Sequence, residues 1–387
     1  MRQQGAGLDT QRVDTVVVGG GQAGLATGYH LKSRGRQFVI LDAGPRVGHA
    51  WRSRWDSLRL FTPASFDALP GLRFPAPNGH FPSKDEMADY LERYAAHFDL
   101  PVRLGVRVDA LTGGPDGYVI EAAESRWATS RVVVATGPYS HPYVPPFAPL
   151  LDPATVQLHS ASYRNPGQLR EGNALVVGAG NSGAEIALEL ATSRETVLAG
   201  RDTGRVPIPL GSIGFRMLRH LRVDRWPGSV IARLLSRGGD PLVRVHPTDL
   251  RRAGVRRAGR VVGVTDGRPV LADGQSDGEV LAVANVVWCT GFVPDYRWIR
   301  LPVTNPDGRP RHDRGVVCEA PGLYFVGLRL QSTVASGLVG GVGVDAEHVV
   351  DVLCAGAPST PPTRADSRTH DASSRPSRAS RRSRPST

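Results

Sequence analysis

Cysteine is scarce in this sequence, and its few cysteines are widely separated. The 387 residues include three, Cys289, Cys318 and Cys354. No CxxC pair is therefore present that could pass electrons as a dithiol, and no cysteine cluster has the spacing of a metal site. The composition excludes a dithiol relay, and we predict no bound metal.

Long apolar runs are also missing. No stretch reaches the roughly 18 apolar residues of a transmembrane helix, and the first twelve residues, MRQQGAGLDTQR, lack the apolar run of a signal peptide. We therefore expect a cytoplasmic protein without integral membrane contact.

Aromatic residues are absent from the last 25 residues, where much of the positive charge lies. The chain has a formal net charge of +11, and residues 363–387 hold seven arginines and two aspartates, a net charge of +5. Such a segment has too little apolar surface to offset the entropy of ordering it. We predict that residues 356–387 form a disordered basic tail. A nucleic-acid or acidic-membrane role for this tail is the less favoured alternative, because stacking residues are missing.

A dinucleotide fingerprint is present near the N-terminus. The β-branched run 13–18 predicts a buried strand, and it leads into Gly19, Gly20, Gly21, Gln22, Ala23 and Gly24. A helix to about Ser33 and a strand ending at Asp42, 18 residues after Gly24, complete a βαβ unit. The alternative is an ordinary tight turn.

Each residue of this fingerprint has a chemical reason. Gly19 permits the tight turn, Gly21 lets backbone N–H groups approach a pyrophosphate, and Gly24 lets the helix pack on the strand. Asp42 would accept hydrogen bonds from a ribose and would repel a 2′-phosphate, which suits FAD or NAD.

A second fingerprint begins after the apolar run 174–177, and its residues are Gly178, Ala179, Gly180, Asn181, Ser182 and Gly183. Arg201 occupies the position equivalent to Asp42. Because a guanidinium makes a bidentate pair with a phosphate, Arg201 favours NADPH over NADH. An exposed surface arginine is the alternative.

Small-polar-glycine turns follow two further strands. The run 131–134 ends in Ala135, Thr136 and Gly137, and the run 285–288 ends in Cys289, Thr290 and Gly291. Such turns let a chain cross closely beside a cofactor. A hairpin around residues 113–117, a strand ending at Gly327 and a glycine-rich helix over 336–350 complete the pattern.

The predicted fold is α/β, with two Rossmann-like dinucleotide-binding domains, the NADPH domain being inserted into the FAD domain. The expected ranges are 12–150 for the first part of the FAD domain, 151–284 for the NADPH domain with its linker, and 285–355 for the second part of the FAD domain. Within the NADPH range, the apolar spacing of residues 207–242 predicts helices. We expect them to cover their own domain; a substrate entrance or a membrane-touching surface is the alternative.

The order of motifs resembles the flavin-containing monooxygenase family, in particular its bacterial single-chain members. The resemblance covers residues 12–355 and is most specific in RVGHAWRSRWDSLRLFTP (46–63), ATGPYSHPYVP (135–145) and WCTGFVPDYRW (288–298). It implies that Trp51, Phe61 and Thr62 lie near the isoalloxazine, Val108 near the adenine and Gln331 near the pyrimidine edge. Core packing is the alternative for Trp51, Trp55 and Phe61.

The sequence departs from the family pattern at two places. His159 and Tyr163 match half of a linker signature, whereas Pro153 and Thr155 replace its Phe and Gly. His159 either orients the linker or is a structural histidine. Phe61-Thr62 stands where mammalian-type members carry an Asn, which argues against the usual oxygenation of sulfur and nitrogen; related plant auxin-forming members also lack that Asn.

The resemblance implies that NADPH reduces FAD at N5 and that dioxygen then reacts at C4a. We expect a monooxygenase that acts on a small organic substrate through a flavin C4a-peroxide, with substrate and dioxygen as its partners. The alternatives are an NADPH-flavin reductase or oxidase without oxygen transfer, and a non-enzymatic redox-sensing regulator. No catalytic residue and no oligomeric state is assigned from the sequence.

Overall fold

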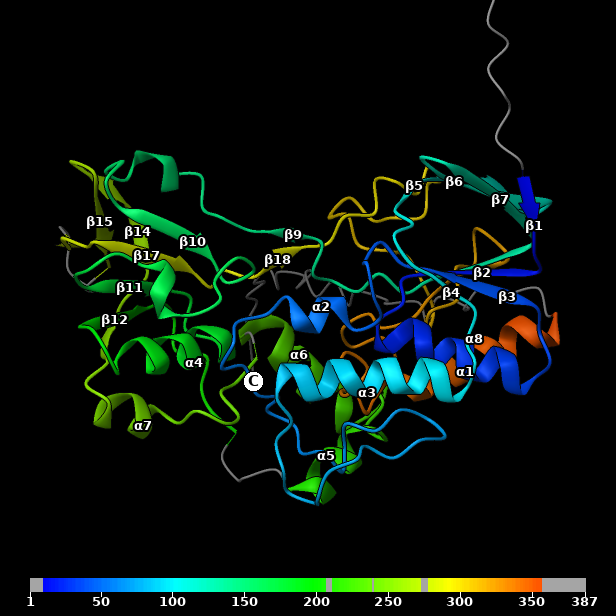
Figure 1. Cartoon of the computed structure of the whole chain (residues 1–387), viewed down its shortest axis with the longest axis horizontal. Coiled ribbons are helices and arrows are strands. Elements are labelled where there is room, and N and C mark those ends of the chain that lie inside the picture. The colour runs from blue at the N-terminus through cyan, green and yellow to red at the C-terminus, as the bar shows by residue number, and fades with distance from the viewer. Residues whose placement is uncertain (1–9, 207–210, 239, 273–277, 357–387) are drawn as a thin grey trace, which may run out of the picture.

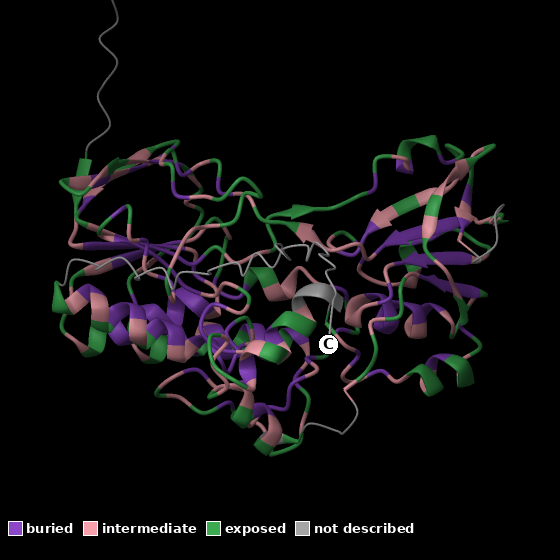
Figure 2. Cartoon of the chain, turned by 180° about the vertical axis from the view of Figure 1, so that it is seen from behind, coloured by how far each residue is buried: buried purple, intermediate pink, exposed green. Residues whose placement is uncertain are grey.

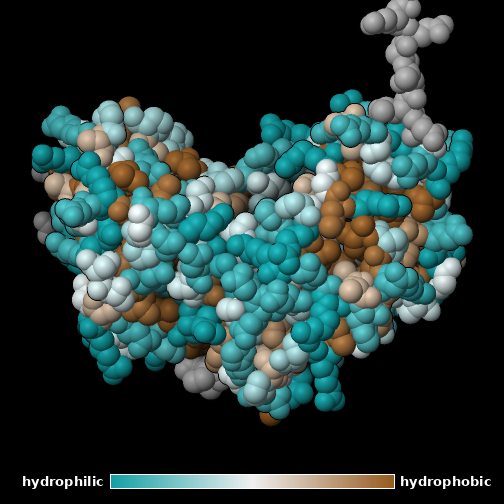
Figure 3. All heavy atoms as spheres, viewed as in Figure 1, coloured by the Kyte–Doolittle hydropathy of each residue, from teal (hydrophilic) through white to brown (hydrophobic). Residues whose placement is uncertain are grey.

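The computed structural model describes residues 10–206, 211–238, 240–272 and 278–356. It has two lobes, each built on a five-stranded parallel sheet (Figure 1). Seen as a surface, the lobes are separated by a hollow on their upper side (Figure 3). The predicted α/β class with two Rossmann-like domains is confirmed.

The first lobe contains the N-terminal fingerprint. Its sheet has the order β19-β8-β2-β3-β4. These strands are β2 (Thr15–Val18), β3 (Phe38–Leu41), β4 (Val102–Arg103), β8 (Arg131–Val134) and β19 (Leu323–Phe325). They are rich in β-branched and apolar residues and are largely buried, as expected for parallel strands covered on both faces (Figure 2).

Two different layers cover this sheet. Val17 packs against helices, whereas Val16 and Val18 pack against a second, four-stranded sheet, because successive side chains of a strand point to opposite faces. The helices of this lobe are α1 (Gln22–Ser33), α2 (His49–Arg52), α3 (Lys84–His97) and α8 (Val342–Ala355). The second sheet contains β1 (Thr10–Arg12), β5 (Val108–Gly114), β6 (Gly117–Ala122) and β7 (Ser125–Thr129). Its strands β5, β6 and β7 are antiparallel, whereas β1 runs parallel to β7.

The second lobe repeats this design. Its parallel sheet has the order β10-β17-β11-β12-β13. Its strands are β10 (Val156–His159), β11 (Ala174–Val177), β12 (Thr196–Ala199), β13 (Arg256–Ala258) and β17 (Asn285–Trp288). The helices are α4 (Asn181–Leu190) and α7 (Pro247–Arg252), and the opposite layer has β14 (Val261–Thr265), β15 (Arg268–Leu271) and β16 (Glu279–Val280). Two 3-10 turns, η1 (Ala148–Leu150) and η2 (Pro166–Gln168), precede β11.

The structure shifts one predicted boundary. We expected the chain to return to the first lobe at residue 285, but β17 pairs with both β10 and β11 inside the second sheet. The return therefore follows Trp288, because an apolar run placed between two parallel strands is buried on both faces.

Two short strands connect the lobes. β9 (His141–Pro142) belongs to the outgoing linker and β18 (Phe292–Val293) to the returning linker. They form an antiparallel pair in which His141 is opposite Val293. Figure 1 shows this pair between the two lobes.

The helices expected within 207–242 are α5 (Ser212–Leu218) and α6 (Gly228–Gly238). We expected these helices to cover their own domain. This is wrong for the side of the segment that faces the first lobe. Phe215 packs against Phe66 of the first lobe, with 5.4 Å between ring centroids, and the N–H of Val223 donates to the carbonyl of Ser332 at 2.9 Å. This part of the chain therefore connects the two lobes below the linkers.

The C-terminal helix starts later than predicted. α8 begins at Val342 instead of 336, because residues 336–341 form turns that cross other backbone closely. A Cβ on Gly340 would lie 1.8 Å from the carbonyl oxygen of Phe66. The basic tail predicted over 356–387 lies outside the described residues from 357 onward. No helix in the described ranges is long and apolar enough to cross a membrane.

Candidate functional site

The first fingerprint forms an open cradle at the start of α1. Gly21 is the N-cap of this helix, and a Cβ placed on it would meet no atom within 4 Å. Gly19 has a φ of +108°, and a Cβ there would lie 2.5 Å from the carbonyl oxygen of Ala135. A Cβ on Gly24 would lie 1.8 Å from the carbonyl oxygen of Gly19. The structure thus gives each glycine a different reason to lack a side chain: the tight turn at Gly19, the open space at Gly21 and the close helix packing at Gly24.

Asp42 is held in place beside this cradle. One carboxylate oxygen accepts the N–H of Gly20 at 2.6 Å, and the other accepts the N–H of Gly44 at 2.8 Å. Each oxygen keeps a lone pair for a further donor. The side chain is therefore fixed and still able to accept a ribose hydroxyl.

A cavity of about 510 Å³ extends along this cradle. Its lining includes Gly19, Gly20, Gly21, Gln22, Asp42, Trp51, Val106, Arg107, Val108, Asp109, Thr136 and Trp298. The cavity thus joins the glycine turn, the acid after β3 and the predicted adenine-side Val108. The open space above Gly21 and the free lone pairs of Asp42 fit an FAD molecule.

The second fingerprint has the same backbone as the first. Its N-cap Gly180 has φ −78° and ψ −170°, against −78° and −169° at Gly21, and a Cβ on Gly180 would also meet no atom within 4 Å. A Cβ on Gly178 would lie 2.2 Å from the carbonyl oxygen of Cys289, and one on Gly183 would lie 1.8 Å from that of Gly178. Gly178 therefore has the same relation to Cys289 that Gly19 has to Ala135. Arg201 is exposed just after β12.

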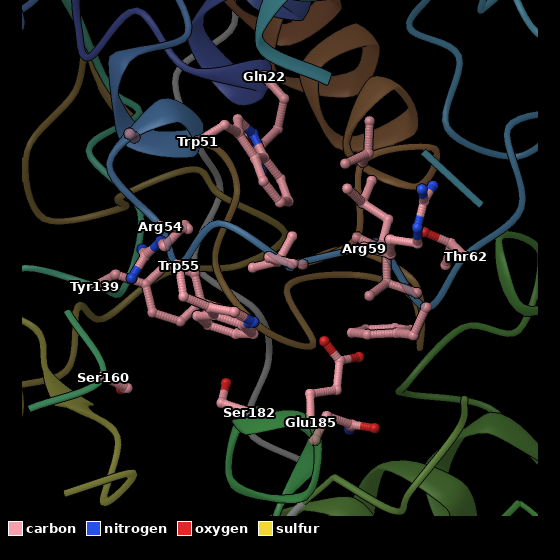
Figure 4. Close-up of a pocket in the computed structure, with 18 of the residues that line it drawn as sticks. Gln22, Trp51, Arg54, Trp55, Arg59, Thr62, Tyr139, Ser160, Ser182 and Glu185 are labelled. Atoms are coloured by element: carbon pink, nitrogen blue, oxygen red, sulfur yellow. The ribbon is translucent and has the colours of Figure 1, made fainter. Parts of the chain in front are cut away.

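A second cavity, of about 240 Å³, lies between the lobes (Figure 4). Gln22, Ala50 and Trp51 line both cavities. The indole N–H of Trp51 donates to the side-chain oxygen of Gln22 at 3.3 Å. The other lining residues include Arg54, Trp55, Leu58, Arg59, Phe61, Thr62, Tyr139, Ser160, Asn181, Ser182, Glu185, Phe292, Leu338 and Val339. The cavity thus brings the segment 50–62 of the first lobe to the start of α4.

Thr62 has a buried partner behind the cavity wall. Its hydroxyl is hydrogen-bonded to Asp67 at 2.5 Å, and Asp67 is fully buried. Burial raises the pKa of the Asp67 carboxyl to about 8, against the opposing effect of the Thr62 hydrogen bond. Asp67 is therefore largely neutral near pH 7.

Arg54 occupies the side of the cavity next to the linkers. Its guanidinium carbon lies 5.4 Å from the ring centre of Tyr139 and 5.3 Å from that of Phe292. Burial lowers the pKa of Arg54 from its usual value, yet an arginine stays charged. Arg54 belongs to the first lobe, and its guanidinium stacks on an aromatic ring from each linker. This contact holds the first lobe against the paired linkers β9 and β18.

His159 lies against the same pair of linkers. Its ring packs edge-on against Phe292 at 5.1 Å, its Nε2 is hydrogen-bonded to the carbonyl of Gly291 at 3.0 Å, and its Nδ1 accepts the N–H of Ala161. Both ring nitrogens thus bond to backbone, which fits a histidine that fixes the linker geometry.

Glu185 reaches the cavity from α4. One of its oxygens accepts the guanidinium of Arg244, with the closest N···O distance at 3.1 Å. The residue is 8 % exposed, and Figure 4 shows its carboxylate pointing into the cavity. Burial raises the pKa of Glu185 to about 7, although Arg244 opposes this rise.

Some predicted residues lie away from both cavities. Gln331 is buried, and its side chain bonds to backbone, donating to the carbonyl of Phe325 at 2.9 Å and accepting the N–H of Leu328. These bonds hold the loop 325–331 together; the contact of Gln331 with the pyrimidine edge stays a prediction. Gly327 packs against the fingerprint helix, since a Cβ there would lie 2.8 Å from the Cβ of Ala23.

The turn residues form close crossings. Gly137 and Gly291 have φ values of +69° and +85°, which favour glycine. Thr136 lines the larger cavity and Ala135 contacts Gly19.

The sequence alone missed several lining residues. Glu185 follows Gly183 by two residues, so the sole acid in the first two turns of α4 was a usable signal. Arg54, Tyr139 and Trp298 lie inside the quoted family stretches, but their neighbours come from other parts of the chain. Spacing along the chain contains no information on such contacts.

Comparison with known proteins shows that this chain is similar to flavoproteins in sequence and fold. Residues 16–205 match a family model described as pyridine nucleotide-disulphide oxidoreductase. An uncharacterized CzcO-like oxidoreductase of Geobacillus kaustophilus is 41% identical over 352 residues, which cover 88% of this chain and 98% of that protein.

A solved structure extends the similarity to the whole fold. A flavin-containing monooxygenase from Stenotrophomonas maltophilia is 30% identical, with a TM-score of 0.72, and the match covers 89% of this chain and 99% of that one. A probable indole-3-pyruvate monooxygenase, YUCCA1 of Arabidopsis thaliana, is 35% identical over 181 residues, or 45% of this chain and 44% of that protein.

Proposed function

Since this chain belongs to the flavin-containing monooxygenase family, we propose that it is an NADPH-using flavoenzyme that transfers one oxygen atom of dioxygen to a small organic substrate. One observation carries the proposal most directly. The cavity of about 240 Å³ is lined both by the segment after the first fingerprint and by the first turns of α4 after the second. A nicotinamide and a flavin ring held by the two fingerprints would therefore meet there.

The residues divide into binding groups for the two cofactors. Gly21 and its neighbours would hold the pyrophosphate of FAD, Asp42 its ribose and Val108 its adenine side. Gly180 and Ser182 would hold the pyrophosphate of NADPH, with Arg201 at its 2′-phosphate. Bound FAD supplies the redox chemistry, accepting the hydride of NADPH and activating dioxygen.

The protein contributes orientation and the exclusion of water. Trp51 and Gln22 lie at the junction of the two cavities, so the ring end of FAD would lie against them. Trp55, Phe61 and Leu338 give the smaller cavity an apolar wall. Such a wall keeps water from the reacting centre and favours oxygen transfer over release of hydrogen peroxide.

A disulfide-reducing function is disfavoured, although the matched family model carries that description. The chain has no CxxC pair. Burial raises the pKa of the Cys289 thiol to about 12, so this cysteine is a poor thiolate nucleophile. An NADPH-driven oxidase that releases hydrogen peroxide is the alternative that the following experiment separates.

The test measures product and hydrogen peroxide together. The FAD-loaded protein receives NADPH, dioxygen and a panel of ketones, amines, sulfides and 2-oxo acids. We expect one oxygenated product per NADPH consumed with at least one class. Stoichiometric hydrogen peroxide with every class would replace the proposal by the oxidase function.

Phe61→Ser tests the role of the apolar wall. We expect this variant to divert NADPH oxidation toward hydrogen peroxide, because a hydroxyl admits water to the cavity. Phe81→Ser is the matched control, since Phe81 is partly exposed and does not line the cavity. Equal peroxide fractions in the two variants would remove Phe61 from the mechanism.

A further inference from the structure

We propose that Glu185 supplies the proton consumed when oxygen is transferred, so that the second lobe contributes a catalytic carboxyl group to the shared cavity. This inference rests on the proposed oxygenase function. It gives that function a proton donor, in addition to the glycines and Arg201, which we propose as cofactor-binding residues.

The geometry sets Glu185 apart from a structural ion pair. Both bonds from Arg244 go to the same carboxylate oxygen, Oε1, from Nε at 3.2 Å and from Nη2 at 3.1 Å. The arginine thus fixes the side chain through one oxygen and leaves Oε2 for the cavity. Figure 4 shows the carboxylate directed into the cavity, beside Trp55.

The position of Glu185 is rigid. It lies on the second turn of α4, and its helix neighbour Asn181 bonds to the loop that carries Arg244. The Asn181 side chain donates to the carbonyl of Pro241 at 3.1 Å and accepts the N–H of Val243 at 3.1 Å. Helix and loop therefore hold the carboxyl from two sides.

Glu185 is the sole carboxyl group among the described residues that line this cavity. The other charged or titratable groups there are Arg54, Arg59 and Tyr139. Arginine does not release a proton at neutral pH, and a phenol does so poorly. A proton source inside the cavity therefore falls to Glu185.

The surroundings keep this carboxyl protonated to an unusual extent. Burial raises its pKa to about 7, and Arg244 is the cation that opposes the rise. At the start of α7, which packs on α4, the titratable groups are His246 and Asp249; the Asp249 carboxylate accepts the N–H of His246. Near neutral pH, a much larger share of the molecules would therefore carry the proton on Glu185 than on an exposed glutamate.

The chemistry requires one such proton. NADPH, dioxygen, the substrate and one proton give NADP⁺, the oxygenated substrate and water. NADPH is oxidised and dioxygen is reduced; the O–O bond breaks, one oxygen atom bonds to the substrate, and the other is released as water once it has been protonated. Glu185 gives its proton to the leaving oxygen and afterwards takes a proton from solvent.

The pH profile of kcat for oxygenated product tests this role. In the wild type we expect kcat to fall as pH rises through about 7, because the protonated carboxyl is the active form. Glu185→Gln should lower kcat about 100-fold at low pH and abolish the fall, with little change in the KM for NADPH. Arg244→Met should move the fall to higher pH, since it removes the cation that lowers the pKa of Glu185.

A control and an independent readout complete the test. Glu195→Gln, an exposed glutamate of the same lobe, should leave the profile unchanged. Infrared titration of the FAD-loaded protein without NADPH should show, in the difference between wild type and Glu185→Gln, a carboxylic acid band that disappears near pH 7; the carboxyl of Asp67 contributes equally to both proteins and cancels in this difference. That readout needs no turnover.

The outcomes separate this role from the function itself. Product formation with a wild-type kcat and pH profile in Glu185→Gln would overturn the role of Glu185 alone. An unmoved or lowered inflection in Arg244→Met would overturn it as well. A wild type that releases only hydrogen peroxide with every substrate class would overturn the oxygenase function and this role with it.

Discussion

Gly21 and Gly180 are equivalent glycines, to which our proposal assigns different cofactors. Each caps its helix, and in each case the direction of a Cβ is open. We predict that Gly21→Val abolishes binding of FAD, because the side chain would fill the space of the pyrophosphate. Gly180→Val should keep FAD and lose NADPH. The flavin-to-protein absorbance ratio and anaerobic reduction by NADPH measure the two effects.

The paired variants control each other, because both place a valine at a helix N-cap. Retention of FAD by Gly21→Val would show that the flavin binds elsewhere. Loss of FAD from both variants would indicate a general loss of folding.

Arg201 sets the preference for NADPH in our proposal. Arg201→Ala should reduce the preference of NADPH over NADH by about 1 to 3 kcal/mol, the scale of a charge-assisted hydrogen bond. The change should appear in the KM for NADPH and not in that for NADH. An unchanged ratio would move the phosphate site, with Arg205 as the next candidate.

Asp67 makes stability depend on pH. Its pKa is raised to about 8 in the folded protein, against about 3.9 in an unfolded chain. Between these values the folded state holds a proton that the unfolded state has lost, so the free energy of unfolding falls as pH rises, by up to about 1.4 kcal/mol per pH unit.

Asp67→Asn removes this titration and keeps a partner for Thr62. We expect urea unfolding to show a shallower loss of stability between about pH 5 and 8 in the variant than in the wild type. Identical slopes would mean that the carboxyl ionises in the folded state as it does in water.

At the scale of elements, the sequence was most informative where the chemistry is local. A strand, a glycine turn, a helix and an acid or arginine follow one another within about thirty residues of sequence, so both fingerprints could be placed in advance. β17 was assigned to the wrong lobe because an apolar run looks the same in either sheet. α8 was started early because the close crossing of Gly340 beside Phe66 joins distant segments.

The packing of helix α5 on the first lobe can be tested with two substitutions on that helix. Phe215 is 2% exposed and packs on Phe66, whereas Ile213, two residues earlier on the same helix, is 69% exposed. Phe215→Ala should lower the free energy of unfolding by about 3 kcal/mol, and Ile213→Ala should leave it nearly unchanged. Urea titration followed by intrinsic fluorescence measures both.

Limited proteolysis shows whether the loss is local. Cleavage within 211–238 should become faster in Phe215→Ala if α5 separates from the first lobe. Equal stability of the two alanine variants would show that the contact contributes nothing to folding.

At the scale of the whole molecule, the smaller cavity could not be predicted from the sequence. Its lining comes from seven separate stretches of chain, at residues 22, 50–62, 139, 160, 181–185, 292 and 337–339. Residues such as Trp51 and Phe61 were expected near the flavin from family stretches, but the approach of Glu185 to them depends on how two lobes pack. Sequence spacing within either lobe does not contain that relation.

The pairing of β9 with β18 has a consequence for engineering. Because His141 lies opposite Val293 and Pro142 opposite Phe292, the chain leaves the flavin lobe and returns to it through neighbouring strands, about 5 Å apart. The intervening 149 residues, 143–291, therefore form a cassette with adjacent ends, the arrangement in which domain grafting succeeds. If Arg201 binds the 2′-phosphate as we propose, a related lobe with an acid in its place, spliced in at these two strands, should change the coenzyme preference from NADPH to NADH. The graft must bring a matching α5, since that helix also contacts the recipient lobe.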